Sequence, residues 1–228
     1  LPASPIADEV APGNDTLGVM LPYTPLHYLL FSDSPQSPSE FAALVMTSGN
    51  LSEEPIVVGN DEALRQLDCV ADWFLIHNRD IAMRVDDSVV RIFEGRERVL
   101  RRSRGFVPQT IDLGIEMDEV LACGGELKNT FCLTKGRYAI LSQRIGDLEN
   151  YEPFASFTAG IEHFSRIFDV TPEVIAHDLH PEYLSTKHAH DRHDAGGVEL
   201  TGVQHHHAHI ASCLVDNGEE GPVIGVAF

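Results

Sequence analysis

Two histidines at helical spacing are the residues of this chain most suited to chemistry. His205 and His209 stand four residues apart in the stretch VQHHHAHIAS, residues 203–212. On a helix, this spacing places both imidazoles one turn apart on one face, close enough to hold one metal ion. Two imidazoles rarely complete a metal site, so a carboxylate, a water or a substrate oxygen must join them. The alternative is a histidine-rich helix start with solvent-facing rings. A solvated helix end is also expected for another group of three, His188, His190 and His193.

A glycine pair with polar neighbours follows a predicted strand in the stretch CGGELKNTF, residues 123–131. Gly124 and Gly125 allow a ligand to approach the backbone closely. The residues after them offer a cation and two polar groups where phosphates could sit, namely Lys128, Asn129 and Thr130. The stretch is not a P-loop, which requires another spacing of glycine and lysine. An ordinary turn is the alternative, and the residues alone favour it.

Three further segments combine hydroxyls, an amide and arginines, which could together bind an acyl phosphate or an adenylate. They are TSGNLS at residues 47–52, DDSVV at 86–90 and RRSRG at 101–105. The aspartates could instead form a turn before a strand, and the arginines could simply lie on the surface. A fourth candidate, DLHPEY at residues 178–183, follows a predicted strand, at the edge where α/β sheets bind ligands.

Short strands and helices must position these residues. Up to residue 112, the pattern predicts helices at 25–31 and 61–70 and strands at 42–46, 72–76, 88–93 and 98–100. A domain boundary is expected near residues 108–119, where the sequence turns polar and strand signals restart.

The second half has a more ordered pattern. Strands are predicted at residues 120–123, 130–134 and 138–142, the last two joined by a hairpin turn. Helices at 152–168, 181–191 and 205–216 then alternate with strands at 173–177, 200–203 and from 223 onward. Three strands followed by αβ units are typical of the ribonuclease H-like or actin-like ATPase layout, in which a glycine turn sits at a nucleotide phosphate. The predicted fold class is therefore α/β (α+β), with domains at residues 1–112 and 113–228.

The composition of the chain argues against several classes of function. The 228 residues carry 35 acidic and 16 basic side chains, a formal charge of −19, which argues against general nucleic-acid binding. No apolar run approaches the about 20 residues of a membrane span, and no signal peptide is visible. The four cysteines form no CxxC pair, which fits free thiols in the cytoplasm. The missing initial Met and a strand-like end at residues 222–228 suggest a fragment.

Eight stretches, in order, closely resemble the HypF family of carbamoyltransferases, which mature nickel–iron hydrogenases. They cover nearly the whole chain: LGVMLPYTPLHYLL (17–30), MTSGNLSEEPI (46–56), DDSVVR (86–91), RRSRGFVP (101–108), CGGELKNTFCL (123–133), LSQRIGDLEN (141–150), AHDLHPEYLST (176–186) and VQHHHAHIAS (203–212). The resemblance implies the rear of a YrdC-like mixed-sheet domain followed by the front of a transferase domain of the actin-like ATPase superfamily. The family's acylphosphatase-like and zinc-finger parts, with their zinc, would be absent.

In the family, carbamoyl phosphate is cleaved to carbamate, which reacts with ATP to give carbamoyl-adenylate. The transferase domain passes the carbamoyl group to the C-terminal cysteine of the partner HypE, for cyanide ligand synthesis. By motif, the nucleotide and carbamoyl-adenylate residues would be Ser48, Asn50, Ser88, Arg104, Gly124, Gly125, Lys128, Asn129 and Thr130. The resemblance also implies magnesium with ATP, and iron or zinc on His205 and His209. No catalytic residue is assigned.

Because the family completes the metal site with an aspartate after this stretch, we expect the chain alone to show little activity. Two alternatives remain. One is an O-carbamoyltransferase of small-molecule biosynthesis, in which the two domains occur in the opposite order. The other is a non-catalytic fragment that docks on a protein.

Overall fold

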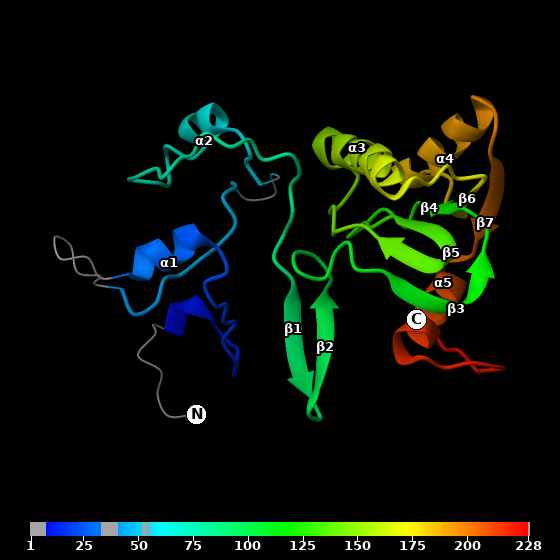
Figure 1. The fold of residues 1–228 in the computed structure, drawn as a ribbon, viewed down its shortest axis with the longest axis horizontal. Coiled ribbons are helices and arrows are strands. Elements are labelled where there is room, and N and C mark those ends of the chain that lie inside the picture. Colours follow the sequence, from blue (N-terminus) through cyan, green and yellow to red (C-terminus); the bar gives the residue numbers. More distant parts are fainter. Residues whose placement is uncertain (1–7, 33–40, 52–53, 55, 228) are drawn as a thin grey trace. The chain divides into compact units, whose positions relative to one another are not determined.

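The computed structural model describes residues 8–32, 41–51, 54 and 56–227 (Figure 1). The chain divides into two compact units, Leu1–Ser48 and Gly49–Phe228. No helix among the described residues is long and apolar enough to cross a membrane.

The first unit contains a short 3-10 helix, η1 (Asp8–Val10), and the helix α1 (Pro25–Phe31). Thr24 caps α1, because its Oγ1 accepts a hydrogen bond of 3.2 Å from the backbone N–H of His27. Pro25 fits the first turn, where its missing N–H has no partner to lose. The predicted helix at residues 25–31 is thereby confirmed.

The second unit begins with the helix α2 (Asn60–Gln66) and the antiparallel hairpin of β1 (Val89–Phe93) and β2 (Arg96–Arg101). Glu94 and Gly95 connect the strands with positive φ angles of 50° and 74°, as a tight hairpin turn requires. These elements confirm the predicted helix after residue 60, although it ends earlier than expected, and the strands near 88–93 and 98–100.

Three predicted strands are not found in the part of the chain that the structure describes. Residues 42–46, 72–76 and 223–227 lie outside the strands and pair with no neighbour as β-structure. Their apolar side chains are largely exposed, with Val45 75%, Trp73 90% and Ile224 97% accessible. The predictions were wrong because a short apolar run forms a strand only where a neighbouring strand accepts its hydrogen bonds.

A five-stranded sheet organises the rest of the second unit. Its strand order is β3-β5-β4-β6-β7, built from β3 (Ile111–Met117), β4 (Val120–Ala122), β5 (Cys132–Leu141), β6 (Val174–Asp178) and β7 (Glu199–Val203). The strands β3 and β4 pair antiparallel with β5, whereas β4, β6 and β7 run parallel to one another. The order of three strands followed by αβ units is as predicted, and the mixed α/β class is confirmed.

The first three strands differ from those predicted. The expected hairpin at residues 135–137 is absent, because β5 continues through Gly136, which has a φ of +57° and pairs with Met117. β3 occupies the region in which a domain boundary was expected. Its sequence, IDLGIEM, alternates apolar and polar residues, which is a strand signal that the expectation of a boundary overlooked.

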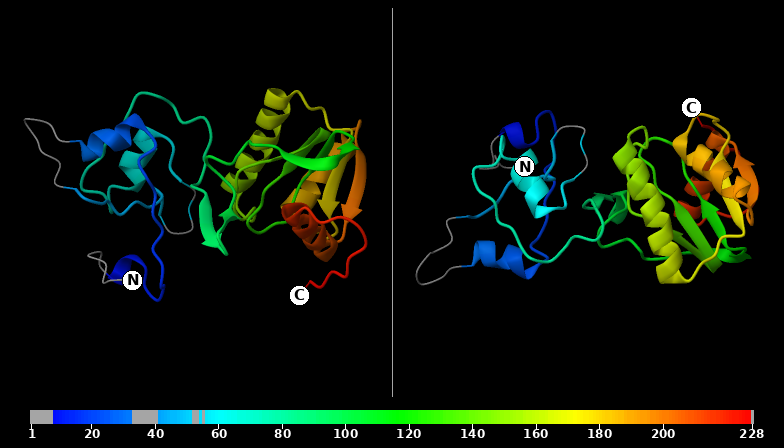
Figure 2. Two further views of the ribbon diagram at one scale, coloured as in Figure 1. Left: turned by 60° about the horizontal axis from the view of Figure 1, so that its bottom comes forward. Right: turned by 90° about the horizontal axis from the view of Figure 1, so that it is seen from above.

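Helices cover the sheet on both faces. The helices α3 (Tyr151–Phe168) and α4 (Leu184–Asp194) lie on one face, and α5 (His205–Asn217) lies on the other (Figures 1 and 2). The parallel strands require such crossover helices, because a tight turn cannot return the chain to the same end of the sheet. α3 contributes four buried residues and α4 three, whereas α5 contributes none.

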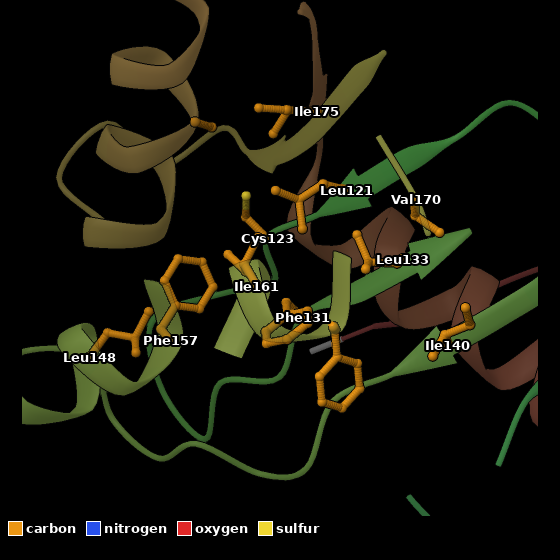
Figure 3. Close-up of a cluster of buried hydrophobic side chains, with 12 residues drawn as sticks. Leu121, Cys123, Phe131, Leu133, Ile140, Leu148, Phe157, Ile161, Val170 and Ile175 are labelled. Carbon is orange, nitrogen blue, oxygen red and sulfur yellow. The ribbon is translucent and has the colours of Figure 1, made fainter. Parts of the chain in front are cut away.

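The hydrophobic core lies between the sheet and α3 (Figure 3). Phe131 stands at its centre, fully buried, and meets Phe157 and Phe164 in edge-to-face contacts at centroid distances of 6.1 and 5.2 Å. Gly160 makes room for this ring, because a Cβ there would lie only 3.0 Å from Phe131 Cε1. Phe131, the residue just before β5, is thereby packed against α3.

We expect Phe131→Ala to lower the free energy of unfolding by about 3–5 kcal/mol, because it removes a fully buried ring. Phe93→Ala is the matched control, since Phe93 on β1 is 59% exposed. That control should change stability by less than about 1 kcal/mol. Urea unfolding followed by circular dichroism measures both, and equal losses would contradict this account of the core.

The four free cysteines differ in how deeply they are buried. It raises the pKa of Cys123 to about 12 and that of Cys132 to about 11, whereas Cys69 and Cys213 are exposed. At neutral pH we expect iodoacetamide to alkylate Cys69 and Cys213 in the folded chain, because the thiolate is the reacting form. Cys123 should react only after unfolding. Mass spectrometry of the digested protein checks the pattern, which rapid labelling of Cys123 in the native chain would overturn.

Candidate functional site

The carboxyl ends of three parallel strands bring the predicted transferase residues together. β4 ends just before the glycine turn at Gly124, β6 ends at Asp178, and β7 ends two residues before His205. Parallel strands end at the same edge of a sheet, and this edge is where α/β sheets bind ligands. The turn and the histidine helix are direct neighbours, because His205 Cε1 lies 3.4 Å from the position of a Cβ added to Gly125.

The glycine turn is a tightly bonded structure. Gly124 has a φ of +69°, and a Cβ there would collide with the carbonyl oxygen of Thr130. The side-chain Nδ2 of Asn129 donates hydrogen bonds to the carbonyls of Cys123 at 2.9 Å and Gly125 at 2.6 Å. Asn129 thus stabilises the conformation of the turn, a role that the sequence did not suggest.

Lys128 differs from Asn129, because its side chain is exposed. Its φ is +51°, and its backbone N–H donates a hydrogen bond of 2.6 Å to Asp147 Oδ1. The backbone is therefore held in a rare conformation while the ammonium group is presented to solvent. Of the polar residues predicted at this turn, Lys128 is best placed to meet a phosphate.

The turn is also tied to the start of α4. Glu126 is 8% exposed, and its Oε2 accepts a hydrogen bond of 2.8 Å from the backbone N–H of Leu184, the first residue of that helix. The hydroxyl of Ser185 donates to the carbonyl of Gly124 at 3.1 Å. Both bonds fix the turn to the same helix.

The histidine pair lies at the N-terminus of α5, as the spacing predicted. Gln204 caps the helix, and its Oε1 accepts a hydrogen bond of 2.9 Å from the backbone N–H of His207. The Nε2 atoms of His205 and His209 face each other at 3.0 Å. Two imidazole nitrogens that point at a common position fit a metal such as zinc or iron. Among the described residues, no third histidine, cysteine or carboxylate completes a cation cage.

Asp178 opens the fourth candidate segment, DLHPEY, but its contact with the histidine pair was not predicted. Its Oδ2 lies 2.5 Å from His205 Nδ1, and its Oδ1 accepts a hydrogen bond of 2.9 Å from the backbone N–H of His180. Burial alone would raise the pKa of Asp178, but the hydrogen bonds from His205 and His180 outweigh it and lower the pKa. The available signal was a carboxylate directly after the predicted strand at residues 173–177.

The other histidine group is only partly as expected. His188 was predicted to be solvated, but its ring packs edge-to-face on Phe157 at 5.3 Å and on Phe154 at 6.2 Å. Burial lowers the pKa of His188 accordingly. The expectation was wrong because α4 turns this position toward α3, which the local polarity of the sequence hides.

The residues predicted to form an adenylate pocket are held by local hydrogen bonds. Ser88 Oγ donates to the carbonyl of Arg104 at 2.8 Å and accepts from the backbone N–H of Ser103 at 2.8 Å. Asn50 Nδ2 donates to the carbonyls of Leu51 and Glu54, at 2.8 and 2.9 Å. The structure brings Ser88 and Arg104 together and shows Asn50 closing its own loop.

Two further residues of the predicted adenylate site are Ser48 and Arg104. Ser48 ends the first unit and is exposed, and Ser52 of the same motif lies outside the described residues. Arg104 Nε lies 3.2 Å from Asp87 Oδ1, and its Nη2 donates to the carbonyl of Val85 at 3.1 Å. A ligand that binds the Arg104 guanidinium would therefore share this group with Asp87.

Asp86, the first aspartate of the candidate segment DDSVV, forms two ion pairs. Its Oδ2 lies 3.6 Å from Arg101 Nη1 and 3.3 Å from Arg144 Nη1. Nearby, Arg84 Nε donates to the carbonyl of Ile56 at 2.7 Å. These contacts connect the segment before β1 with β2 and with the loop after β5.

We expect Gly124→Ala to destabilise the chain by about 1–3 kcal/mol more than Gly218→Ala, because the added methyl group meets the Thr130 carbonyl. Gly218 is a matched control, since its φ of +64° is similar but no atom lies within 4 Å of an added Cβ. Thermal and urea unfolding of both variants measure the difference. Equal losses would show that the turn has room to relax.

Known proteins resemble this chain over both halves. Residues 116–216 match the family model of the HypF Kae1-like domain, and residues 1–103 match the Sua5/YciO/YrdC model, which is described as telomere recombination. The carbamoyltransferase HypF2 of Cupriavidus necator is 46% identical over 96% of this chain and 28% of its own length. The carbamoyltransferase HypF of Rhizobium leguminosarum is 44% identical over 99% of this chain and 29% of its own.

Two solved structures resemble the fold as well. Full-length HypF in a phosphate- and nucleotide-bound form is 47% identical, with a TM-score of 0.78 over 94% of this chain and 32% of that one. HypF of T. kodakarensis is 42% identical, with a TM-score of 0.85 over 95% and 28%. The chain thus spans less than a third of the length of these relatives. In sequence and in fold, the chain belongs to the HypF family.

Proposed function

We propose that this chain forms part of a carbamoyltransferase, with the rear of a carbamoyl-adenylate-forming domain at residues 1–112 and the front of a transferase domain at 113–228. The observation that carries the proposal is the convergence of the Gly124–Gly125 turn with the His205–His209 pair at one sheet edge. A phosphate-binding turn beside a metal-ligand pair suits a site that holds an acyl-adenylate. The names of the relatives support the same reaction class.

In the proposed first reaction, a carbamate oxygen attacks the α-phosphate of ATP, and pyrophosphate leaves with magnesium. By motif, Asn50, Ser88 and Arg104 would bind the nucleotide, and Ser48 belongs to the same motif as Asn50. A guanidinium group stabilises the phosphate charge best when it is held in place, and Arg104 is held by Asp87 and the Val85 carbonyl.

In the proposed second reaction, the C-terminal cysteine thiolate of HypE attacks the carbamoyl carbon, and AMP leaves. The backbone of Gly124 and Gly125 and the ammonium group of Lys128 would hold the phosphate, while Asn129 and Thr130 keep the turn in shape. His205 and His209 would hold a divalent metal, which when bound supplies a Lewis acid for the carbonyl oxygen. Orienting the adenylate between these two groups lowers the entropic cost of the transfer.

The order of the two matched regions separates this proposal from its main alternative. The YrdC-type match precedes the Kae1-like match along the chain. The small-molecule O-carbamoyltransferases were expected to have the reverse order. We therefore favour transfer to a protein thiol over transfer to a small-molecule hydroxyl.

The test uses the natural polypeptide that carries this chain, supplied with ATP, carbamoyl phosphate and HypE. We expect His209→Ala to reduce carbamoylation of HypE by about 10²-fold or more, because the metal pair is broken. Pyrophosphate release should persist, because it belongs to the other domain. Mass spectrometry of the HypE C-terminal peptide and a pyrophosphate assay measure the two steps separately.

His207→Ala is the matched control, because His207 stands on the same helix and only its backbone N–H contributes to the cap. Its carbamoylation rate should equal that of the wild type. If His209→Ala left transfer unchanged, or if the natural polypeptide carbamoylated a small hydroxyl compound in preference to HypE, the proposed function would be wrong.

A further inference from the structure

Asp178 is held in a fixed position by the sheet. It is the last residue of β6 and pairs in parallel register with Val203 of β7, which stands two residues before His205. The backbone carbonyl of Asp178 also accepts a hydrogen bond of 3.0 Å from Thr186 Oγ1 on α4. The strand pairing therefore decides the distance between this carboxylate and the first histidine of α5.

Both oxygens of the carboxylate are in use. Oδ1 accepts from the backbone N–H of His180 at 2.9 Å, and Oδ2 contacts His205 Nδ1 at 2.5 Å. The Asp178 side chain is only 8% exposed, whereas the His205 side chain is 45% exposed. A buried carboxylate is therefore held against one nitrogen of a more exposed imidazole ring.

A carboxylate accepts hydrogen bonds but cannot donate one, so Nδ1 of His205 carries the proton. In the neutral ring, Nε2 then has a free lone pair. This atom faces Nε2 of His209 at 3.0 Å. Asp178 thus selects the tautomer in which His205 presents a metal-binding nitrogen toward its partner histidine.

We propose that Asp178 is a positioning residue that orients His205 and fixes its tautomer for metal binding. This inference shares one assumption with the proposed function, namely that the histidine pair binds a metal. Carboxylates that accept a hydrogen bond from a metal-binding histidine raise the basicity of that ligand, and their loss typically weakens metal affinity by 10–100-fold.

Cobalt(II) titration of the 228-residue chain, followed by visible absorption, tests the proposal without enzyme activity. We expect Asp178→Asn to weaken cobalt binding by about 10–100-fold, because an amide does not hold the Nδ1 proton as a carboxylate does. His205→Ala should abolish the same signal. Asp216→Asn is the matched control, since it removes an equal charge from an exposed position near the far end of α5.

A second measurement needs no substitution. In the wild-type chain labelled with nitrogen-15 histidine, long-range proton–nitrogen NMR spectra should show His205 protonated at Nδ1. This result keeps the inference testable even if Asp178→Asn fails to fold.

Three results would overturn the inference: protonation of His205 at Nε2, equal cobalt affinities for Asp178→Asn and Asp216→Asn, or cobalt binding that does not depend on His205. Failure of the proposed function is a different result, because it would leave the tautomer and the affinity difference intact while carbamoyl transfer is absent.

Discussion

The parallel register of β4, β6 and β7 is the constraint on which the candidate site depends. Each strand contributes one feature at its carboxyl end: the glycine turn, the carboxylate of Asp178 and the start of the histidine helix. These segments are separated by more than 50 residues along the chain at the widest step, yet hydrogen bonds between strands determine their spacing to within one residue. A shift of one residue in either pair would turn Asp178 to the opposite face of the sheet.

Much of this arrangement could be predicted from the sequence. The αβ alternation after residue 150 produced clear helical periodicity in α3, whose apolar stripe meets the sheet as expected. The pair formed by His205 and His209 was recognisable from spacing alone. Motif resemblance identified the family, and both domain matches agree with it.

The remainder depends on contacts between distant segments, which local patterns do not encode. β3 carries the apolar–polar alternation of a strand, but its pairing with β5 follows only from the fold. His188 is polar by type but is covered by the phenylalanines of α3. The connection between Asp178 and His205 spans 27 positions and follows only from knowing which strands are neighbours. The sites near Ser88 and Arg104 are likewise determined by loops that meet in space.

The bond between Glu126 and the first residue of α4 has a consequence for where a phosphate can sit. The N-terminus of a helix normally attracts anions, because its free N–H groups and its dipole carry partial positive charge. Here a buried side chain of the protein already occupies that position, with Glu126 Oε2 at 2.8 Å from the Leu184 nitrogen. The Glu126 carboxylate takes up one of the free N–H groups of α4 and would repel a second anion placed beside it. The start of α4 is thus less attractive to a phosphate than a helix N-terminus without an acidic neighbour.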